Sequence, residues 1–356
     1  MKKILITGGA GFIGSSLAIR LSKEFENIQI TCLDNLSRNG STLNRNRLAK
    51  YGIKFKKADV RQTHPFNTLK CDLIIDAAAE PSVLAGVKGH DTKYIVDTNL
   101  VGTLNVLELA RKQSAGLIFL SSSRVFPIVT LQKLQLRKLK HRFDLSANQK
   151  IPGVTKHGIS EDFPLHGSRT LYGATKLAAE VMAAEYAAQF GIPIMINRCG
   201  VIAGPWQMGR IDQGIVALWV ASHAYSLPLS YIGYGGRQVR DILHIEDLSD
   251  LVIKQVRDGF KHWTGTAFNV GGGLKNSLSL RELTNISTHV TSNRINITLV
   301  DQIRRGDVPF YVTDSRRVQQ LFEWTPRRSA AKTIQDTARW IQDYREILAP
   351  LFSRKV

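Results

Sequence analysis

Short apolar runs alternate with stretches of helical periodicity over the first half of the chain. The runs have the length of buried strands, and the stretches between them repeat apolar residues every three or four positions, as amphipathic helices do. This alternation indicates an α/β fold with a parallel sheet, whose ligand site lies at the carboxyl ends of the strands. We expect strands at 4–6, 28–34, 53–60, 71–76 and 116–123, and helices at 15–25, within 35–52, at 94–113 and at 170–190.

A glycine turn follows the first expected strand. Its spacing, Gly8, Gly11 and Gly14, is GxxGxxG, and a helical pattern comes directly after it. Glycines let the backbone approach a pyrophosphate, which then sits at the helix N-terminus, although the triplet could also be only a tight turn. Asp34 ends the next strand about 20 residues after Gly14, where a carboxylate accepts hydrogen bonds from ribose hydroxyls and repels a 2′-phosphate. We therefore predict NAD rather than NADP.

Later strand ends supply further cofactor candidates. A carboxylate at Asp59 could meet the adenine amino group, or it could only cap the next segment. Asn99 could contact the cofactor, or it could be a structural residue of its helix. Cys199 is expected to pack beside the nicotinamide rather than act as a nucleophile, because no histidine partner is evident. The predicted cofactor-binding residues are Gly8, Gly11, Phe12, Ile13, Gly14, Asp34, Asn35, Asp59, Val60, Ala77, Ala78, Ala79, Asn99, Tyr172, Lys176 and Cys199.

The second half of the chain is less regular. Regular periodicity lapses between 127 and 163, which predicts either an ordered insertion or a mobile lid. Beyond 200 we expect helices at 209–224 and 249–260, a hairpin and strand within 228–245, and a last helix near 329–347. The expected domains are an NAD-binding Rossmann domain over 1–200 and a smaller α/β substrate lobe over 201–356, of which about 240–260 returns to the first domain.

Composition limits the class of protein. The net charge is +19, with a dense basic segment at 131–156, which indicates either an anionic partner or simply a solvated basic surface. No pattern typical of nucleic-acid binding accompanies it, so no nucleic-acid partner is expected. The three cysteines and the histidines show no metal spacing, and no apolar run has the length of a membrane span. These features favour a cytoplasmic protein without a metal.

The main chemical candidates are Ser122, Tyr172 and Lys176. A spacing of four residues places Tyr172 and Lys176 on one helix face. A neighbouring ammonium stabilises the phenolate and lowers the pKa of tyrosine from about 10. The phenol can then exchange a proton with a substrate hydroxyl while the nicotinamide exchanges a hydride, and the Ser122 hydroxyl can hold the substrate oxygen. A non-catalytic NAD-sensing protein would need the glycine turn but neither Tyr172 nor Lys176.

Six segments together resemble the extended short-chain dehydrogenase/reductase family of nucleotide-sugar epimerases and dehydratases. They are TGGAGFIG, LDNLS, DTNLVGTLNVLE, FLSSSRVF, YGATKLAAE and RDILHIEDL. The resemblance implies a doubly wound Rossmann domain and a tightly held NAD that is regenerated in each turnover. It also implies that Ser122, Tyr172 and Lys176 are catalytic and that Asn99 lies on the cofactor side. A homodimer or homotetramer is implied as well, with Leu104, Leu107 and the helix at 177–189 as possible contacts.

The resemblance also bears on the reaction. Dehydratases of the family carry Asp-Glu directly after the catalytic Ser/Thr, whereas this chain has Ser123-Arg124, so epimerisation is expected. Residues 197–219, with the 127–163 insertion, are similar to the CDP-paratose (CDP-tyvelose) 2-epimerase group, which implies a CDP-sugar epimerised at C2 and a role in lipopolysaccharide O-antigen biosynthesis. A UDP-hexose 4-epimerase remains the alternative. Phe126 departs from the tyrosine usual in the family. The expected substrate-binding residues are Ser123, Arg124, Asn197, Gln213, Arg240 and Arg304. Gln213 could line the nucleotide pocket, or it could lie on a helix surface.

Overall fold

The computed structural model describes residues 2–82, 92–209 and 213–352. These residues form two compact units, which are described separately. Unit 1 comprises residues 1–125, 171–198 and 249–268, and unit 2 comprises 126–170, 199–248 and 269–356. The segment 126–170, which contains the expected insertion, therefore belongs to unit 2, and the part of the second half that joins unit 1 is 249–268.

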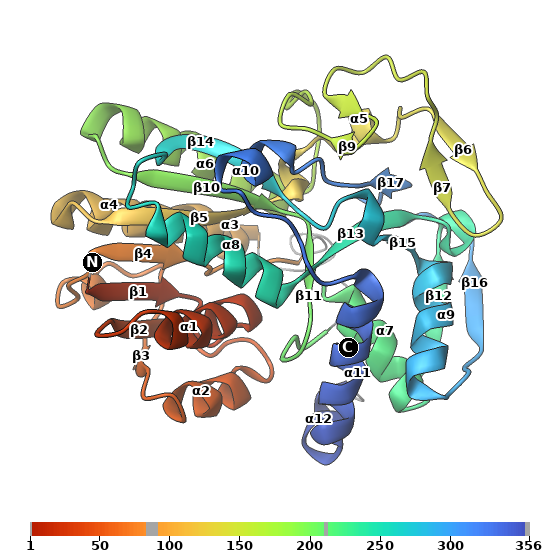
Figure 1. Ribbon diagram of the computed structural model, residues 1–356, viewed down its shortest axis with the longest axis horizontal. Helices are drawn as coiled ribbons and strands as arrows, with labels where there is room; N and C mark the ends of the chain where they lie inside the picture. Colours follow the sequence, from red (N-terminus) through yellow and green to blue (C-terminus); the bar gives the residue numbers. More distant parts are fainter. Residues whose placement is uncertain (1, 83–91, 210–212, 353–356) are drawn as a thin grey trace. The chain divides into compact units, whose positions relative to one another are not determined.

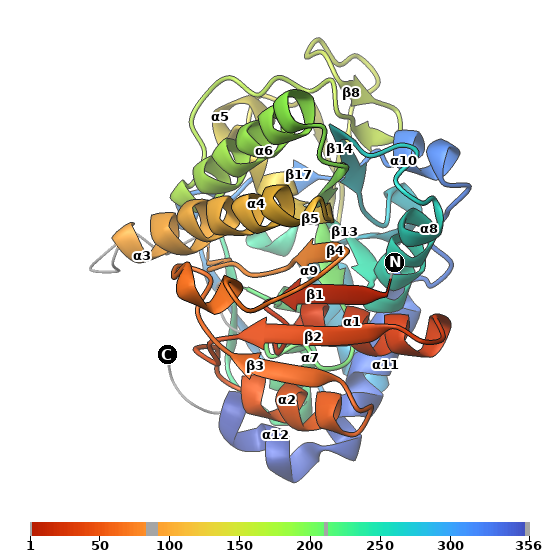
Figure 2. The same cartoon turned by 90° about the vertical axis from the view of Figure 1, so that its left-hand side faces the viewer.

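A seven-stranded sheet forms the centre of unit 1 (Figures 1 and 2). Its order is β14-β10-β5-β4-β1-β2-β3, and β1 pairs in parallel with both β2 and β4. The chain therefore builds outward from β1 in both directions, which is the doubly wound Rossmann arrangement with a switch point beside β1. The strands are β1 (Lys3–Thr7), β2 (Gln29–Asp34), β3 (Lys54–Lys57), β4 (Leu73–Asp76), β5 (Gly116–Ser122), β10 (Ile194–Cys199) and β14 (Thr264–Val270).

Helices pack on this sheet because alternate strand residues point to its two sides. Leu5, Ile74 and Phe119 are buried in one cluster with Leu107 of α4 and Ala179 of α6. The small Ala179 side chain lets α6 approach the sheet closely. The helical segments of the unit are α1 (Phe12–Glu24), α2 (Ser41–Ala49), η1 (His64–Phe66), α3 (Thr92–Val96), η2 (Asp97–Val101), α4 (Gly102–Gln113), η3 (Ser123–Val125), α6 (Leu171–Phe190) and α8 (Ile245–Arg257, from Ser249 onward).

Two sequence expectations in unit 1 need correction. The continuous helix expected at 94–113 is interrupted by a π-helical turn, η2, which contains Asn99. The strand expected at 53–60 ends at Lys57, so Asp59 and Val60 lie in the loop beyond it. π-helical turns within helices are often found at functional sites, which makes the place of Asn99 significant.

Unit 2 is organised around β13 (Val239–His244), which pairs with β11, β15 and β17. The hairpin expected within 228–245 is absent: β12 pairs in parallel with β16, which follows it by more than 60 residues. The helix expected at 209–224 begins at Ile215. The remaining elements are α5 (Ile128–Leu131), β6 (Leu136–Lys138), β7 (Phe143–Leu145), β8 (Val154–Thr155), β9 (Gly158–Ile159), β11 (Val201–Ala203), α7 (Ile215–Ala224), β12 (Leu229–Ile232), η4 (Tyr234–Gly236), η5 (Leu274–Asn276), β15 (Ser277–Ser279), α9 (Leu280–Thr291), β16 (Ile297–Val300), β17 (Phe310–Tyr311), α10 (Arg316–Leu321), α11 (Ala330–Asp343) and α12 (Arg345–Phe352).

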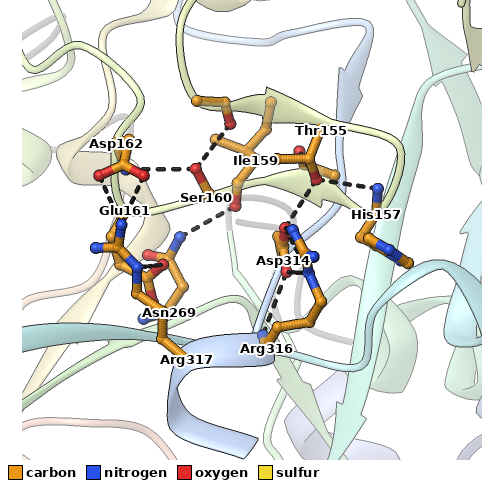
Figure 3. A network of polar contacts seen from close by, with 12 residues as sticks. Thr155, His157, Ile159, Ser160, Glu161, Asp162, Asn269, Asp314, Arg316 and Arg317 are labelled. Carbon is orange, nitrogen blue, oxygen red and sulfur yellow. Dashed lines mark hydrogen bonds and ion pairs between the residues drawn. The ribbon is translucent and has the colours of Figure 1, made fainter. Parts of the chain in front are cut away.

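The 127–163 segment is ordered and tied to the C-terminal part of unit 2. The Ile159 N–H donates to the Val312 carbonyl (2.8 Å), and the Asp314 N–H donates to the Ile159 carbonyl (2.9 Å). Figure 3 shows the side chains around this contact: Thr155 donates to Asp314 (2.7 Å), and Arg317 pairs with Asp162 (2.6 Å). These contacts favour the ordered insertion over the mobile lid for the β8–β9 part of the segment.

Candidate functional site

The glycine turn is shaped by close backbone contacts. Gly8 has a positive φ of 61°, and a Cβ on it would lie 2.6 Å from the Ala77 carbonyl oxygen. Gly11 is the N-cap of α1 and makes no side-chain cap. The first N–H groups of a helix have no acceptor within the helix, so those of Phe12, Ile13 and Gly14 are suited to an anion. The turn therefore fits a pyrophosphate.

Asp34, the last residue of β2, is held against the glycine turn. Its carboxylate accepts the Ala10 N–H (3.0 Å) and the Leu36 N–H (2.8 Å), one on each oxygen. Burial raises the pKa of Asp34, and these backbone hydrogen bonds oppose that rise. The Gly11 N–H is a third backbone donor to this carboxylate, which has about four acceptor positions, so one remains for a ribose hydroxyl. This donor and acceptor set fits the adenosine half of NAD.

Asp59 is engaged by neighbouring side chains. Its two oxygens accept three hydrogen bonds from Arg61, one of them from the backbone N–H, and a fourth from Asn35. The Arg61 hydrogen bonds, opposed in part by burial, lower the pKa of Asp59 to about 2. The four acceptor positions are thus occupied. This arrangement corresponds to the second expectation for Asp59, a cap on the segment that follows it. An adenine contact would need one of these donors to move. Val60 beside it is buried, and its carbonyl accepts from Asn105.

The loop after β4 is fixed from both sides. The Ala77 N–H donates to the Thr7 carbonyl, and Ala77 to Ala79 are half-buried. Asn99 is fully buried and accepts from the Glu80 N–H (2.8 Å), while its amide N–H groups donate to the Glu80 carbonyl and to Thr175 of α6. Asn99 therefore links this loop to the helix that carries Tyr172 and Lys176. In the structure it is a bridging residue.

The chemical candidates gather at the start of α6. Tyr172 and Lys176 lie in its first turns, and Ser122 ends β5. Both β5 and η3, which contains Ser123 and Arg124, pack against α6. Lys176 is only 1% exposed, and its ammonium lies 4.0 Å from the centre of the Phe119 ring. A phenol and a buried ammonium on one helix face, beside a strand that ends in a hydroxyl, can transfer a proton to or from a substrate hydroxyl.

A buried ion pair lies next to Tyr172, Lys176 and Ser122, and the sequence patterns did not predict it. Arg198 of β10 pairs with Glu180 of α6 (2.8 Å), and Ser121 donates to the same carboxylate (2.5 Å). The available signal was the position of Glu180, four residues after Lys176 and so on the same helix face. Its partner could not be read from spacing.

Asn197 is not open to a substrate. Its side chain is fully buried and makes two reciprocal amide hydrogen bonds of 2.9 Å with Gln255 of α8. Asn197 is therefore a packing residue, and its expected substrate role is withdrawn. Cys199, the last residue of β10, is 6% exposed.

The remaining substrate candidates lie in unit 2. Arg240 is bound to Asp307 (2.7 Å) and to the Val239 and Val308 carbonyls, which uses three of its five N–H groups. Arg304 is half-buried whereas Arg305 is exposed, which favours Arg304 as the residue that is held in place. The side-chain oxygen of Gln213 is buried, with no hydrogen-bond partner among the described residues.

Two further observations concern metal ligands and membrane spans. Within 2–82, 92–209 and 213–352, no group of three or more His, Cys, Asp or Glu side chains is arranged to hold a metal ion. Over the same ranges no helix is long and apolar enough to cross a membrane.

This chain belongs to the NAD-dependent epimerase/dehydratase family, whose pattern matches residues 4–271. Its cofactor is NAD, in agreement with the glycine turn and Asp34. Over 95% of its length it is 29% identical to the CDP-paratose 2-epimerase of Salmonella typhi, of which the match covers 98%. It is 26% identical to the dTDP-glucose 4,6-dehydratase of Salmonella typhimurium, over 95% of this chain and 92% of that protein.

The fold is also that of solved epimerases. The UDP-glucuronic acid 4-epimerase of Bacillus cereus, solved with UDP-glucuronic acid and NAD, superposes with a TM-score of 0.78 over 96% of this chain and 99% of its own, at 22% identity. At that identity the likeness establishes the Rossmann-type fold.

Proposed function

We propose that the protein epimerises a nucleotide-activated sugar, with a CDP-linked dideoxyhexose such as CDP-paratose as its substrate and C2 as the reacting carbon. The observation that carries the oxidation and reduction of the sugar is the placement of Tyr172 and Lys176 on one face of α6, packed against the strand that ends at Ser122. The similarity to the Salmonella typhi 2-epimerase over 95% of the chain supports the CDP-sugar and C2.

The chain's own residues have distinct roles in this proposal. Tyr172 removes the proton of the reacting hydroxyl. It returns the proton after the keto-sugar has rotated in the site to present its other face. Lys176 stabilises the phenolate electrostatically, and Ser122 orients the substrate oxygen. Bound NAD would supply the hydride chemistry, as acceptor when the sugar carbon is oxidised and as donor when the keto-sugar is reduced from the opposite face.

The residues after Ser122 favour epimerisation over dehydration. Water elimination needs an acid and a base close to the sugar, in addition to the Tyr172 phenol. Ser123 and Arg124 stand where the dehydratases of the family carry Asp-Glu, and neither can act as a carboxylic acid. We infer that the keto-sugar is re-reduced without loss of water.

We assign the nucleotide diphosphate to Arg240 and Arg304, because guanidinium groups bind phosphate oxygens in pairs. Gln213 would accept a hydrogen bond from the nucleotide through its buried oxygen. The three cysteines are free thiols, which supports a reducing, cytoplasmic location.

A homodimer through α4 and α6 is also proposed, with one change from the sequence expectation. Leu107 is fully buried within its own subunit and therefore cannot contact a second copy of the chain. Leu104 of α4 and Val181 and Met182 of α6 are 36%, 56% and 37% exposed, and α4 packs against α6. These apolar side chains are available for a second copy of the chain.

The test is turnover of a panel of CDP- and UDP-sugars, with products followed by proton NMR. Inversion at C2 of CDP-paratose is the expected result. Conversion of UDP-glucose or UDP-galactose alone would replace the proposal with a 4-epimerase. An NAD-sensing protein without turnover would bind the cofactor and convert none of the sugars.

A further inference from the structure

A buried ion pair lies one helical turn after Lys176. Glu180 of α6 and Arg198 of β10 are 4% and 7% exposed. Arg198 donates three hydrogen bonds to the carboxylate: from Nε at 3.1 and 3.0 Å, and from Nη2 at 2.8 Å. Ser121 Oγ adds a fourth at 2.5 Å. These four contacts come from three donor groups, since the single Nε–H is shared between the two carboxylate oxygens, and each oxygen accepts two of them.

The pair connects the elements that carry the proposed chemistry. Ser121 directly precedes Ser122 on β5, and Glu180 lies four residues after Lys176 on α6. The Glu180 carboxylate is therefore bonded to both neighbouring strands, β5 and β10. Removing the network would release the register of α6 against β5, and with it the positions of Tyr172 and Ser122.

The pair also sets the local charge. Lys176 and Glu180 are at i and i+4 of one helix, a spacing at which an ammonium and a carboxylate interact. With Arg198 the three buried charges sum to +1, and without Arg198 they sum to zero. Arg198 thus balances Glu180, so that the Lys176 charge remains available to the Tyr172 phenol.

The other charged residues near α6 lie on elements that pack against its other sides. The described residues of β5 carry none, and β10 contributes Arg198 alone. The elements packed against the other sides of α6 carry Lys93 and Asp97, which pair with each other, Glu108, which pairs with Arg111, and also Lys112 and Arg124. Arg198 and Glu180 are the charges buried on the same helix face as Lys176.

We propose that Arg198 and Glu180 are positioning residues that hold α6 against β5 and keep the Lys176 charge available for the Tyr172 phenolate. This inference rests on the proposed roles of Tyr172 and Lys176. It predicts that the ionisation of Tyr172 follows the summed charge of Lys176, Glu180 and Arg198.

The test uses four variants that change this charge in the NAD-loaded protein. Arg198→Met lowers the sum to zero, Glu180→Gln raises it to +2, and the double variant restores +1. Arg198→Lys keeps the charge and loses the forked hydrogen bonds. The readout is the tyrosinate absorbance against pH, taken as the difference between each protein and the same protein carrying Tyr172→Phe. This readout needs no turnover, so it separates a failure of this inference from a failure of the proposed reaction.

The expected midpoint rises by roughly one pH unit in Arg198→Met and falls by a similar amount in Glu180→Gln. It returns to the wild-type value in the double variant and in Arg198→Lys. If the pair were merely structural, all four variants would be less stable, and their tyrosinate midpoints would not follow the summed charge. Equal midpoints in Arg198→Met and Arg198→Lys, or a double variant displaced further than either single one, would overturn the inference. Should Arg198→Met fail to fold, Glu180→Gln and Arg198→Lys still give the comparison.

Discussion

Gly14 lies against Gly8 so closely that a Cβ on Gly14 would stand 2.3 Å from the Gly8 carbonyl oxygen. The third glycine of the turn is therefore required by packing within the chain. Gly14→Ala should lower the free energy of unfolding by roughly 1–3 kcal/mol through overpacking, despite a gain in helix propensity of about 1 kcal/mol. It should also weaken NAD binding, because the backbone of the turn must shift.

Chemical denaturation and NAD titration measure these two effects. Gly52→Ala is the control for NAD binding alone: nothing lies within 4 Å of a Cβ there, but its φ of 65° gives the alanine a backbone cost of its own. Full NAD affinity in Gly14→Ala would contradict the assignment of this turn to the pyrophosphate.

Tyr172 is the proposed base, so Tyr172→Phe should abolish nearly all turnover of the sugar substrate while NAD stays bound. General acid–base catalysis contributes typically 10²–10⁴-fold, which sets the expected loss. The measurement is NMR-detected epimerisation, together with NAD released on denaturing the purified protein. Wild-type turnover in this variant would exclude Tyr172 as the base.

His244 should make stability depend on pH. Burial and the nearby Arg328 lower its pKa to about 4, and its Nδ1 accepts the Glu246 N–H, which favours the neutral ring. The unfolded chain, with an imidazole pKa near 6.5, then binds more protons than the folded one between these values. The contribution of neutral His244 to the free energy of unfolding is therefore fully present above pH 6.5. It is lost as the pH drops towards 4, by about 3 kcal/mol in total.

Urea unfolding at several pH values tests this linkage. His244→Gln should flatten the slope between pH 6.5 and 4, whereas His289→Gln, at an exposed position of α9, should leave the slope unchanged. An unaltered slope in His244→Gln would assign the acid sensitivity to other groups.

Val181 tests the proposed dimer. It is 56% exposed on α6, so Val181→Glu would place a charge in an apolar subunit contact. The molar mass in light scattering should fall to that of a monomer. Leu299→Glu is the control, because Leu299 is 65% exposed but lies on β16 of unit 2. An unchanged mass for Val181→Glu would remove this face from the subunit interface.

Local patterns predicted the parts of the fold that depend on neighbouring residues. The glycine turn and Asp34 are close in sequence to the elements that position them, and the order of strands and helices in the first half follows from periodicity. The π-helical turn at Asn99 was not predicted, because one inserted residue hardly changes helical periodicity.

Long-range pairings could not be read from the sequence. Asn197 looked like a ligand-binding residue, but its amide partner Gln255 is 58 positions away. Likewise, β12 resembled one arm of a hairpin, whereas its parallel partner β16 lies beyond α9. The Arg198–Glu180 pair was missed for the same reason: no local spacing specifies which strand a buried carboxylate will face.

The contact between the β8–β9 segment and residues 312–317 has a consequence for synthesis of the chain. Asp314 follows Thr155 by 159 residues. At about 5–20 residues per second, the ribosome makes the second partner roughly 8–30 s after the first. During that interval Ile159 lacks its final backbone partners, and Glu161 and Asp162 lack Arg317. The β8–β9 segment thus lacks these contacts until residues 312–317 have been made, and a chain stalled before Val312 would present it to chaperones and proteases without them.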